Sequence, residues 1–161
     1  MSGLSQFLFA TLVLFLPILA ANQAGAVSDV LNLPLSTVPV STRWLGRNKT
    51  LAPYYVAPFL SWAVFYWLGS PQLWPQAIAI GCGAVLGDHV KSFLKRRLGY
   101  PPGVQWWPDR IDFSVGGGLA ELLVFPRVTI WHVAAMVFAA YPLHYAGNLI
   151  SYHLGWRKTP H

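Results

Sequence analysis

Charged side chains are scarce in this sequence, and acidic ones are the scarcest. Only 10% of the 161 residues are charged, with five Asp and Glu against eleven Lys and Arg. A soluble globular domain carries about 25% charged residues, whereas 55% of this chain is hydrophobic. Too few charges are present to cover the surface of a soluble domain. The composition therefore predicts an all-α integral membrane protein.

Cysteine is also nearly absent, because Cys82 is the only one in the chain. A disulfide framework within one chain is therefore excluded, and the apolar run around Cys82 predicts a buried thiol. The sequence contains no P-loop, no G-x-G-x-x-G and no His or Cys cluster with zinc spacing. The net charge of +6 would suit nucleic acid, but the cations lie between membrane-length apolar segments. That distribution argues against a nucleic-acid partner.

Long apolar segments are what the sequence has in abundance, and they predict one transmembrane domain over residues 1–161. We expect a bundle of about five helices that cross the bilayer near residues 4–22, 52–68, 74–90, 113–130 and 131–154. The first segment has a cleaved secretory signal as its alternative. Such signals usually open with positive residues, and this segment has none, so a retained span is favoured.

The cations gather on one side of this predicted arrangement. Loop 41–50, loop 95–112 with the end of the preceding span from residue 91, and the carboxyl-terminal tail share that side. They hold ten cations: Arg43, Arg47, Lys49, Lys91, Lys95, Arg96, Arg97, Arg110, Arg157 and Lys158. The other side receives only Arg127. The positive-inside rule then predicts a multi-pass protein of the cell (inner) membrane, with its amino terminus outside and its carboxyl terminus and polar loops cytoplasmic.

The stretch 87–113 holds three of the five carboxylates and five of the cations. If the third span continues as a helix, Asp88, Lys91, Ser92 and Lys95 fall at i, i+3, i+4 and i+7 and share one face. Such a polar stripe at a membrane exit suits an aqueous cleft. The alternative is an ordinary basic helix end that contacts lipid phosphates. Arg97 points away from the stripe and is placed to snorkel toward headgroups.

Asp109 and Asp112 follow a Pro- and Gly-rich loop and are three residues apart. At the start of a helix this spacing places both carboxylates on one side, where they, together with Asp88, suit Mg²⁺. Helix capping is the alternative for a lone D-x-x-D. Glu121 is expected to face the bundle interior or to pair with Arg127. The glycines at 116–118 predict a close approach of another helix.

Read together, these residues resemble the CDP-archaeol synthase family. The resemblance lies in G-D-x-x-K-S-F-x-K-R-R, a loop with P-G, and D-x-x-D-F. The matching residues are Gly87, Asp88, Lys91, Ser92, Phe93, Lys95, Arg96, Arg97, Pro102, Gly103, Asp109, Asp112 and Phe113. The segment L-G-R-N-K-T (residues 45–50) is similar to the family's K-T loop. The bacterial CDP-diacylglycerol synthases are broader relatives.

The resemblance implies Mg²⁺-dependent transfer of a cytidylyl group from CTP to a membrane lipid phosphate, archaeol-phosphate-like or phosphatidate-like, with release of pyrophosphate. It implies catalytic roles for Asp88, Lys91, Lys95, Asp109 and Asp112, with the metal on Asp88, Asp109 and Asp112. It implies phosphate or nucleotide binding by Lys49, Thr50, Ser92, Arg96, Arg97 and Arg110.

Three alternatives stay open at this point. Two are other enzymes that use CTP: a phosphatidate cytidylyltransferase and a kinase of a lipid alcohol. The third is a non-enzymatic membrane protein whose basic cytoplasmic face binds anionic lipid or a partner protein. The sequence leaves open a homodimer, and it does not distinguish ether from ester lipids.

Overall fold

The computed structural model describes residues 3–101, 104 and 106–153, and the part it describes is helical. The predicted tail cations Arg157 and Lys158 and the loop residues Pro102 and Gly103 lie outside the described residues. The elements, in chain order, are α1 (Gly3–Asn22), α2 (Ala24–Val30), α3 (Pro53–Trp67), η1 (Pro71–Leu73), α4 (Trp74–Arg97), η2 (Trp107–Arg110), α5 (Asp112–Val124) and α6 (Ile130–His153).

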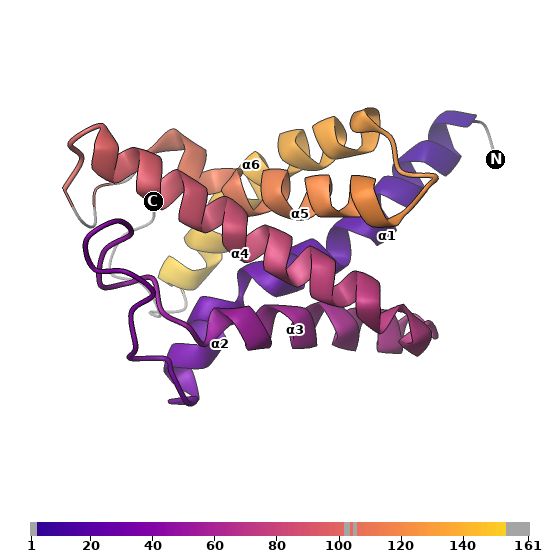
Figure 1. Cartoon of the computed structure of the whole chain (residues 1–161). Helices are drawn as coiled ribbons and strands as arrows, with labels where there is room; N and C mark the ends of the chain where they lie inside the picture. Colours follow the sequence, from indigo (N-terminus) through magenta and orange to yellow (C-terminus); the bar gives the residue numbers. More distant parts are fainter. Residues whose placement is uncertain (1–2, 102–103, 105, 154–161) are drawn as a thin grey trace.

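The helices run back and forth, so that the connections gather at two ends of the bundle (Figure 1). The long segment between α2 and α3 lies at the same end as the connection from α4 to α5. The α3–α4 and α5–α6 connections lie at the opposite end. The first end therefore collects the cations of the 41–50 loop and of the last turn of α4, whereas Arg127 belongs to the second.

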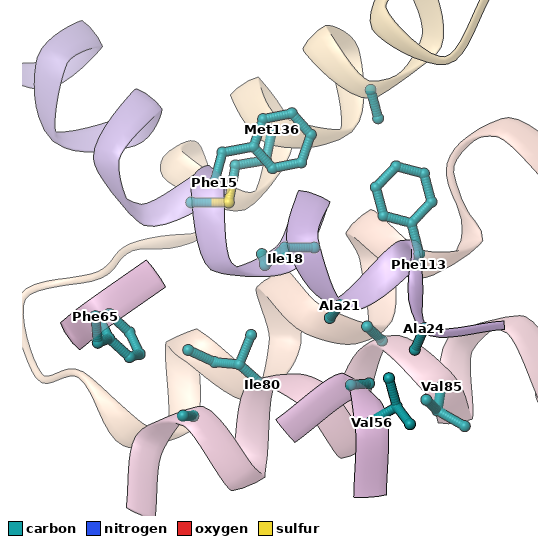
Figure 2. Close-up of a cluster of buried hydrophobic side chains, with 14 residues drawn as sticks. Phe15, Ile18, Ala21, Ala24, Val56, Phe65, Ile80, Val85, Phe113 and Met136 are labelled. Atoms are coloured by element: carbon teal, nitrogen blue, oxygen red, sulfur yellow. The ribbon is translucent and has the colours of Figure 1, made fainter. Parts of the chain in front are cut away.

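The core consists of apolar side chains from α1 and the helices around it (Figure 2). Phe15 and Ile18 of α1 are 2% and 0% exposed. They belong to the same cluster as Phe65 of α3, Ile80 of α4 and Met136 of α6. Because the first helix supplies the centre of this core, removing it would expose apolar surface on its neighbours.

Glycines set how closely α4 and α5 pack. A Cβ added at Gly116 would overlap the carbonyl oxygen of Gly83, and one at Gly87 would overlap the carbonyl oxygen of Asp112. Gly117 faces Ile18 of α1 and Gly118 faces Val133 of α6. The predicted close approach at residues 116–118 is confirmed, and it involves three helices rather than one.

Two stretches are long and apolar enough to cross a membrane among the described residues, namely Gly3–Val30 and Pro71–Arg97. The other predicted crossings, and the count of about five, stay predictions. Helix α5 is shorter than the predicted span 113–130, because it ends at Val124. Phe125 precedes Pro126 and is extended, with φ −119° and ψ 109°, as steric contact with the proline ring favours.

Glu121 lies on the buried face of α5 and is 0% exposed. Neither of its carboxyl oxygens has a hydrogen-bond partner among the described residues, and Arg127 is exposed beyond the end of the helix. The structure therefore supports the interior placement of Glu121 and not its pairing with Arg127.

Candidate active site

Three carboxylates converge on one ammonium group. Lys91 Nζ lies 3.0 Å from Asp88 Oδ1, 3.0 Å from Asp109 Oδ1 and 2.8 Å from Asp112 Oδ2. The side chain of Lys91 is 13% exposed and that of Asp112 only 6%. Charges this well shielded from water interact more strongly than surface pairs do. The sequence predicted that these four residues share a site, but it did not predict Lys91 at the centre.

Two further lysines complete the cluster. Lys95 Nζ lies 2.8 Å from Asp109 Oδ2, and Lys49 Nζ lies 2.6 Å from Asp88 Oδ1. Three carboxylates are thus matched by three ammonium groups, and the cluster has no formal net charge. We refer to Lys49, Asp88, Lys91, Lys95, Asp109 and Asp112 as the carboxylate–lysine cluster.

Helix α4 positions one wall of this cluster, because it continues as predicted past Gly87 to Arg97. Asp88 and Lys91, three residues apart, form an ion pair on the helix surface, and Lys95 follows one turn later on the same face. Ser92 is buried beside them, at 3% exposure. The helix ends where Gly99 takes a positive φ of 79°, a common helix stop.

The second wall comes from η2 and the first turn of α5. Asp109 Oδ2 accepts a hydrogen bond of 2.8 Å from the Trp106 backbone N–H, and Asp112 Oδ1 accepts one of 2.7 Å from the Phe113 N–H. Both aspartates therefore bind local backbone, as the capping alternative expects, and also join the cluster. The close contact at Gly87 brings the start of α5 against α4.

The third wall is the loop before α3, which a short antiparallel pairing holds in place. The Val40 N–H donates to the Lys49 carbonyl at 2.7 Å, and the Leu51 N–H donates to the Val38 carbonyl at 3.0 Å. This pairing directs Lys49 to Asp88. Thr50 lines a cavity of about 260 Å³ that also borders Asp88 and Asp112.

His89 borders the same small cavity. Its ring stacks on Tyr54, with centroids 5.3 Å apart, and its Nδ1 lies 3.1 Å from the Tyr54 hydroxyl. These contacts fit the structural role expected for the scattered histidines, although His89 Nε2 is buried without a hydrogen-bond partner among the described residues.

The pKa of the Asp109 carboxyl is lowered from its ordinary value. Burial raises this pKa, but the hydrogen bonds from Lys95 and the Trp106 N–H, together with Lys91, more than offset it. Asp109 is thus held ionised at neutral pH, as a ligand for a cation must be. Its Oδ1 is buried and meets Lys91 at ion-pair distance without the geometry of a hydrogen bond.

A basic cavity of about 660 Å³ opens on one side of the cluster. Its charged lining comprises five cations and one carboxylate: Arg47, Lys49, Lys91, Lys95, Arg96 and Asp109. Ser92 also lines it, as predicted for a residue on the polar stripe. Arg47 was not among the predicted site residues, although its place in the L-G-R-N-K-T segment could have indicated it. The excess of positive charge suits a polyanion.

An apolar groove of about 650 Å³ between α4 and α5 meets the cluster from another side. Leu86, Val90, Val115 and Leu119 line it, and Lys91 and Asp112 form its polar end. Cys82 also lines the groove and is only half-buried, so the prediction of a buried thiol was wrong. Cys82 lies on the face of α4 that borders the open groove.

Two predicted phosphate ligands lie outside the cluster. The Arg97 guanidinium lies over the Trp44 ring, 4.4 Å from its centroid. Arg110 Nη1 donates to the Tyr141 hydroxyl at 2.6 Å, and its guanidinium lies over that ring. Aromatic side chains distant in the sequence hold both arginines, so neither lines the basic cavity. Their predicted contact with phosphate therefore stays a prediction.

The acidic side chains in the described ranges do not form a three-ligand metal site as they stand, because the Lys91 ammonium occupies the point on which they converge. The donors themselves fit a hard divalent cation. Asp88, Asp109 and Asp112 each have an oxygen within 3.0 Å of one atom. A metal on these oxygens requires the ammonium of Lys91 to move aside.

Several known proteins are similar to this chain. A family model described as CarS-like, CDP-archaeol synthase, matches residues 54–161. The chain is 38% identical over 96 residues to a CDP-archaeol synthase from Methanospirillum hungatei, a match that covers 56% of this chain and 58% of that protein. It is 31% identical over 162 residues to one from Aeropyrum pernix, over 92% of this chain and 90% of that protein.

The chain thus spans little more than half the length of the first of these relatives and nearly all of the second. A solved structure of an intramembrane enzyme for archaeal membrane lipids biosynthesis is also similar, with a TM-score of 0.67 and 26% sequence identity. That match covers 84% of this chain and 90% of the other. The helical fold is therefore shared along most of the molecule.

Proposed function

Because this chain belongs to the CDP-archaeol synthase family, we propose that it transfers a cytidylyl group from CTP to a membrane lipid phosphate and releases pyrophosphate. The observation that carries the proposal is the position of the carboxylate–lysine cluster between a basic cavity and an apolar groove. Lys91 borders both. The basic cavity suits the triphosphate of CTP, and the groove suits the hydrocarbon of a lipid.

The chemistry needs charge neutralisation more than proton transfer. A phosphate monoester has its second pKa near 6, so the lipid phosphate is already a nucleophile at pH 7. One of its oxygens attacks the α-phosphorus of CTP, and the bond from that phosphorus to the bridging oxygen breaks. The electron pair leaves with pyrophosphate. Since two polyanions must meet, positioning and electrostatic stabilisation provide the catalysis.

The cations of the cluster then divide between the two substrates. Lys95 and Arg96 bind the triphosphate from the basic cavity, and Lys91 lies where the two phosphates meet. Lys49 and Thr50 close the site from the loop before α3, and Ser92 donates a hydrogen bond to phosphate. The cluster supports this division because its ammonium groups are preorganised by the carboxylates before substrate binds.

We assign a divalent cation, Mg²⁺, to Asp88, Asp109 and Asp112. When bound there it neutralises the triphosphate oxygens and the leaving pyrophosphate. The three carboxylates supply the hard oxygen donors that Mg²⁺ prefers. Lys91, which now neutralises them, is released for phosphate.

The family and the two long apolar helices make this a membrane protein, and the finer placement is part of the proposal. The cluster lies at the cytoplasmic face of the inner membrane, with the amino terminus outside. The collection of cations at one end of the bundle supports this orientation.

The test incubates purified protein with labelled CTP, Mg²⁺ and a panel of lipid phosphates that includes ether and ester lipids. Cytidine attached to the lipid, with pyrophosphate released, is the expected result. A lipid-alcohol kinase would instead leave phosphate without cytidine, and a non-enzymatic lipid-binding protein would leave CTP intact.

The variant that probes the mechanism is Asp112→Asn, which keeps the shape of the side chain and removes its charge. We expect product formation to fall by about 10³-fold or more, because a metal ligand and a Lys91 partner are lost together. Arg127→Gln is the control, since it also replaces a charge by an amide, and Arg127 is exposed in the α5–α6 connection, away from the cavities of the site. Equal turnover in the two variants would remove Asp112 from the mechanism.

A further inference from the structure

A second basic pocket lies next to the candidate active site, and apart from Arg96 its residues take no part in the chemistry above. It encloses about 210 Å³ and is lined by Arg43, Trp44, Phe93, Arg96 and Arg97. We call it the arginine–aromatic pocket. Only Arg96 is shared with the basic cavity. No carboxylate belongs to its lining, so it cannot share the metal-binding role of the cluster.

Ring stacking holds the arginines of this pocket in place. The Arg97 guanidinium carbon lies 4.4 Å from the Trp44 centroid and 5.3 Å from the Phe93 centroid, so one cation contacts both rings. Arg43 lies 4.9 Å from the Trp44 centroid. Stacking covers the faces of a guanidinium and leaves its N–H edges available to acceptors. The pocket is therefore preorganised for an anion.

No protein anion supplies that partner in the part of the chain that the structure describes. The ion pairs found there all belong to Lys49, Lys91 and Lys95. Arg96 donates through Nη1 to the Tyr100 carbonyl, and its Nε is buried without a partner. Three cations around one small pocket, without a carboxylate between them, favour an external anion.

The position of the pocket indicates which kind of anion it binds. Arg97 is the last residue of the stretch Pro71–Arg97, which is long and apolar enough to cross a membrane. Leu86, Val90 and Leu94 are 51%, 58% and 46% exposed on α4. Helical geometry puts Arg97 at the end of that apolar stripe. Trp44, beside Arg97, is a residue type enriched at the membrane interface.

We propose that the arginine–aromatic pocket binds the phosphate of an anionic membrane lipid. The guanidinium edges of Arg43, Arg96 and Arg97 donate to the phosphate oxygens, an arrangement that arginine forms readily. This site binds lipid and does no chemistry. It shares Arg96 with the cytidylyl transfer proposed above, and Arg43 and Arg97 belong to this site alone.

The experiment measures lipid retention by native mass spectrometry of the delipidated protein in a neutral detergent. The lipids added are phosphatidylglycerol, phosphatidic acid and phosphatidylcholine, with inorganic phosphate as a separate competitor. We expect the anionic lipids to be retained over phosphatidylcholine. In the double variant Arg43→Gln and Arg97→Gln this preference falls about tenfold, because each arginine near the headgroup contributes to it.

Two controls separate a built pocket from general surface charge. Arg127→Gln removes an exposed arginine in the α5–α6 connection, at the other end of the bundle, and should leave the preference unchanged. The double variant Arg43→Lys and Arg97→Lys keeps the charge but loses the flat stacked donors. It should lose most of the preference, and full retention by it would overturn the proposal.

The lipid arms distinguish the source of the phosphate. Equal retention of phosphatidylglycerol and phosphatidic acid assigns the pocket to bilayer lipid, whereas a marked preference for phosphatidic acid would contradict the proposal, because it would make the pocket part of the substrate site. Displacement of bound lipid by inorganic phosphate alone, or a wild-type protein without anionic preference, would contradict the proposal even if the double variant did not fold. Since CTP turnover is not the readout, failure here leaves the proposed function standing.

Discussion

Lys91 contacts three carboxylates in this structure, and in the proposed reaction it binds phosphate. Its ammonium lies within 3.0 Å of oxygens from Asp88, Asp109 and Asp112. Removing it leaves three carboxylates facing one another, which costs free energy unless another cation takes its place. A divalent cation is the natural replacement, because it needs the same oxygens.

Lys91→Gln is therefore expected to lower cytidylyl transfer and at the same time to strengthen Mg²⁺ binding without CTP. Thermal unfolding in detergent, with and without Mg²⁺, measures the second effect. At a Mg²⁺ concentration about 100 times the dissociation constant, binding stabilises the folded protein by about 2.7 kcal/mol. We expect this gain in the variant and a smaller one in the wild type. Identical shifts in both proteins would argue against a metal at the three carboxylates.

Residue spacing explains which residues share a face of one helix, but it does not explain the contacts between segments. The positions of Asp88, Lys91 and Lys95 on one face of α4 follow from helical periodicity alone. The aromatic contacts of Arg97 and Arg110 do not, because Trp44 and Tyr141 are far away in the sequence. Periodicity describes one helix at a time, whereas these arginines are placed by contacts between segments.

At the scale of elements, the α4–α5 contact determines whether the cluster can form. The backbones meet at Gly83, Gly87 and Gly116, where an added Cβ would overlap main-chain atoms of the other helix. The same contact brings Asp112 to Asp88 and Lys91. Side-chain volume at these glycines should therefore act on activity as well as on stability.

Gly87→Ala is expected to separate the two helices, lower the free energy of unfolding by about 1–3 kcal/mol and strongly reduce cytidylyl transfer. Gly3→Ala at the start of α1 is the matched control, because an added Cβ there meets no atom within 4 Å and Gly3 lines none of the cavities of the site. An alanine in that helix should be neutral or stabilising by up to about 1 kcal/mol. Thermal unfolding and product formation are measured on both. A fully active Gly87→Ala protein would show that this contact does not position Asp112.

The groove between α4 and α5 leads to a prediction about lipid chain length. Ala79 and Lys91 both line it on α4 and are twelve residues apart, about 18 Å along a helix. Ala79→Phe is expected to fill the far end and raise KM for long-chain lipid phosphates several-fold, with little change for short chains or for CTP. Ile78→Phe is the control, since Ile78 is 47% exposed and does not line the groove. Equal effects of both variants would place the lipid elsewhere.

Sequence patterns located most helices but not all of their ends. Helix α4 continues past Gly87 as expected, and its polar stripe is where periodicity placed it. Helix α5 ends six residues before the predicted limit, because the conformation of Phe125 before Pro126 stops it at Val124. A hydropathy pattern continues through such a position because the residues stay apolar. Steric contact between the proline ring and the preceding residue nevertheless ends the helix there.

At the scale of the whole molecule, the two ends of the bundle differ in their number of cationic side chains. The loop before α3 and the end of α4 share one end, and the α5–α6 connection with Arg127 lies at the other (Figure 1). Moving a basic loop across a bilayer is disfavoured, so this asymmetry predicts the orientation of the chain. With this orientation the proposed site would face the cytoplasm.

This orientation can be measured by labelling single cysteines from one side of the membrane. In a Cys82→Ala background, Thr37→Cys lies in the exposed loop before α3 and Pro126→Cys in the exposed α5–α6 connection. A membrane-impermeant maleimide added to intact spheroplasts should label position 126 and spare position 37, and inside-out vesicles should show the reverse. Labelling of both positions from the same side would mean that the chain between them crosses the bilayer an even number of times. The ends of the bundle would then not correspond to the two faces of the membrane, and the cation-rich end could not be assigned to the cytoplasm on charge alone.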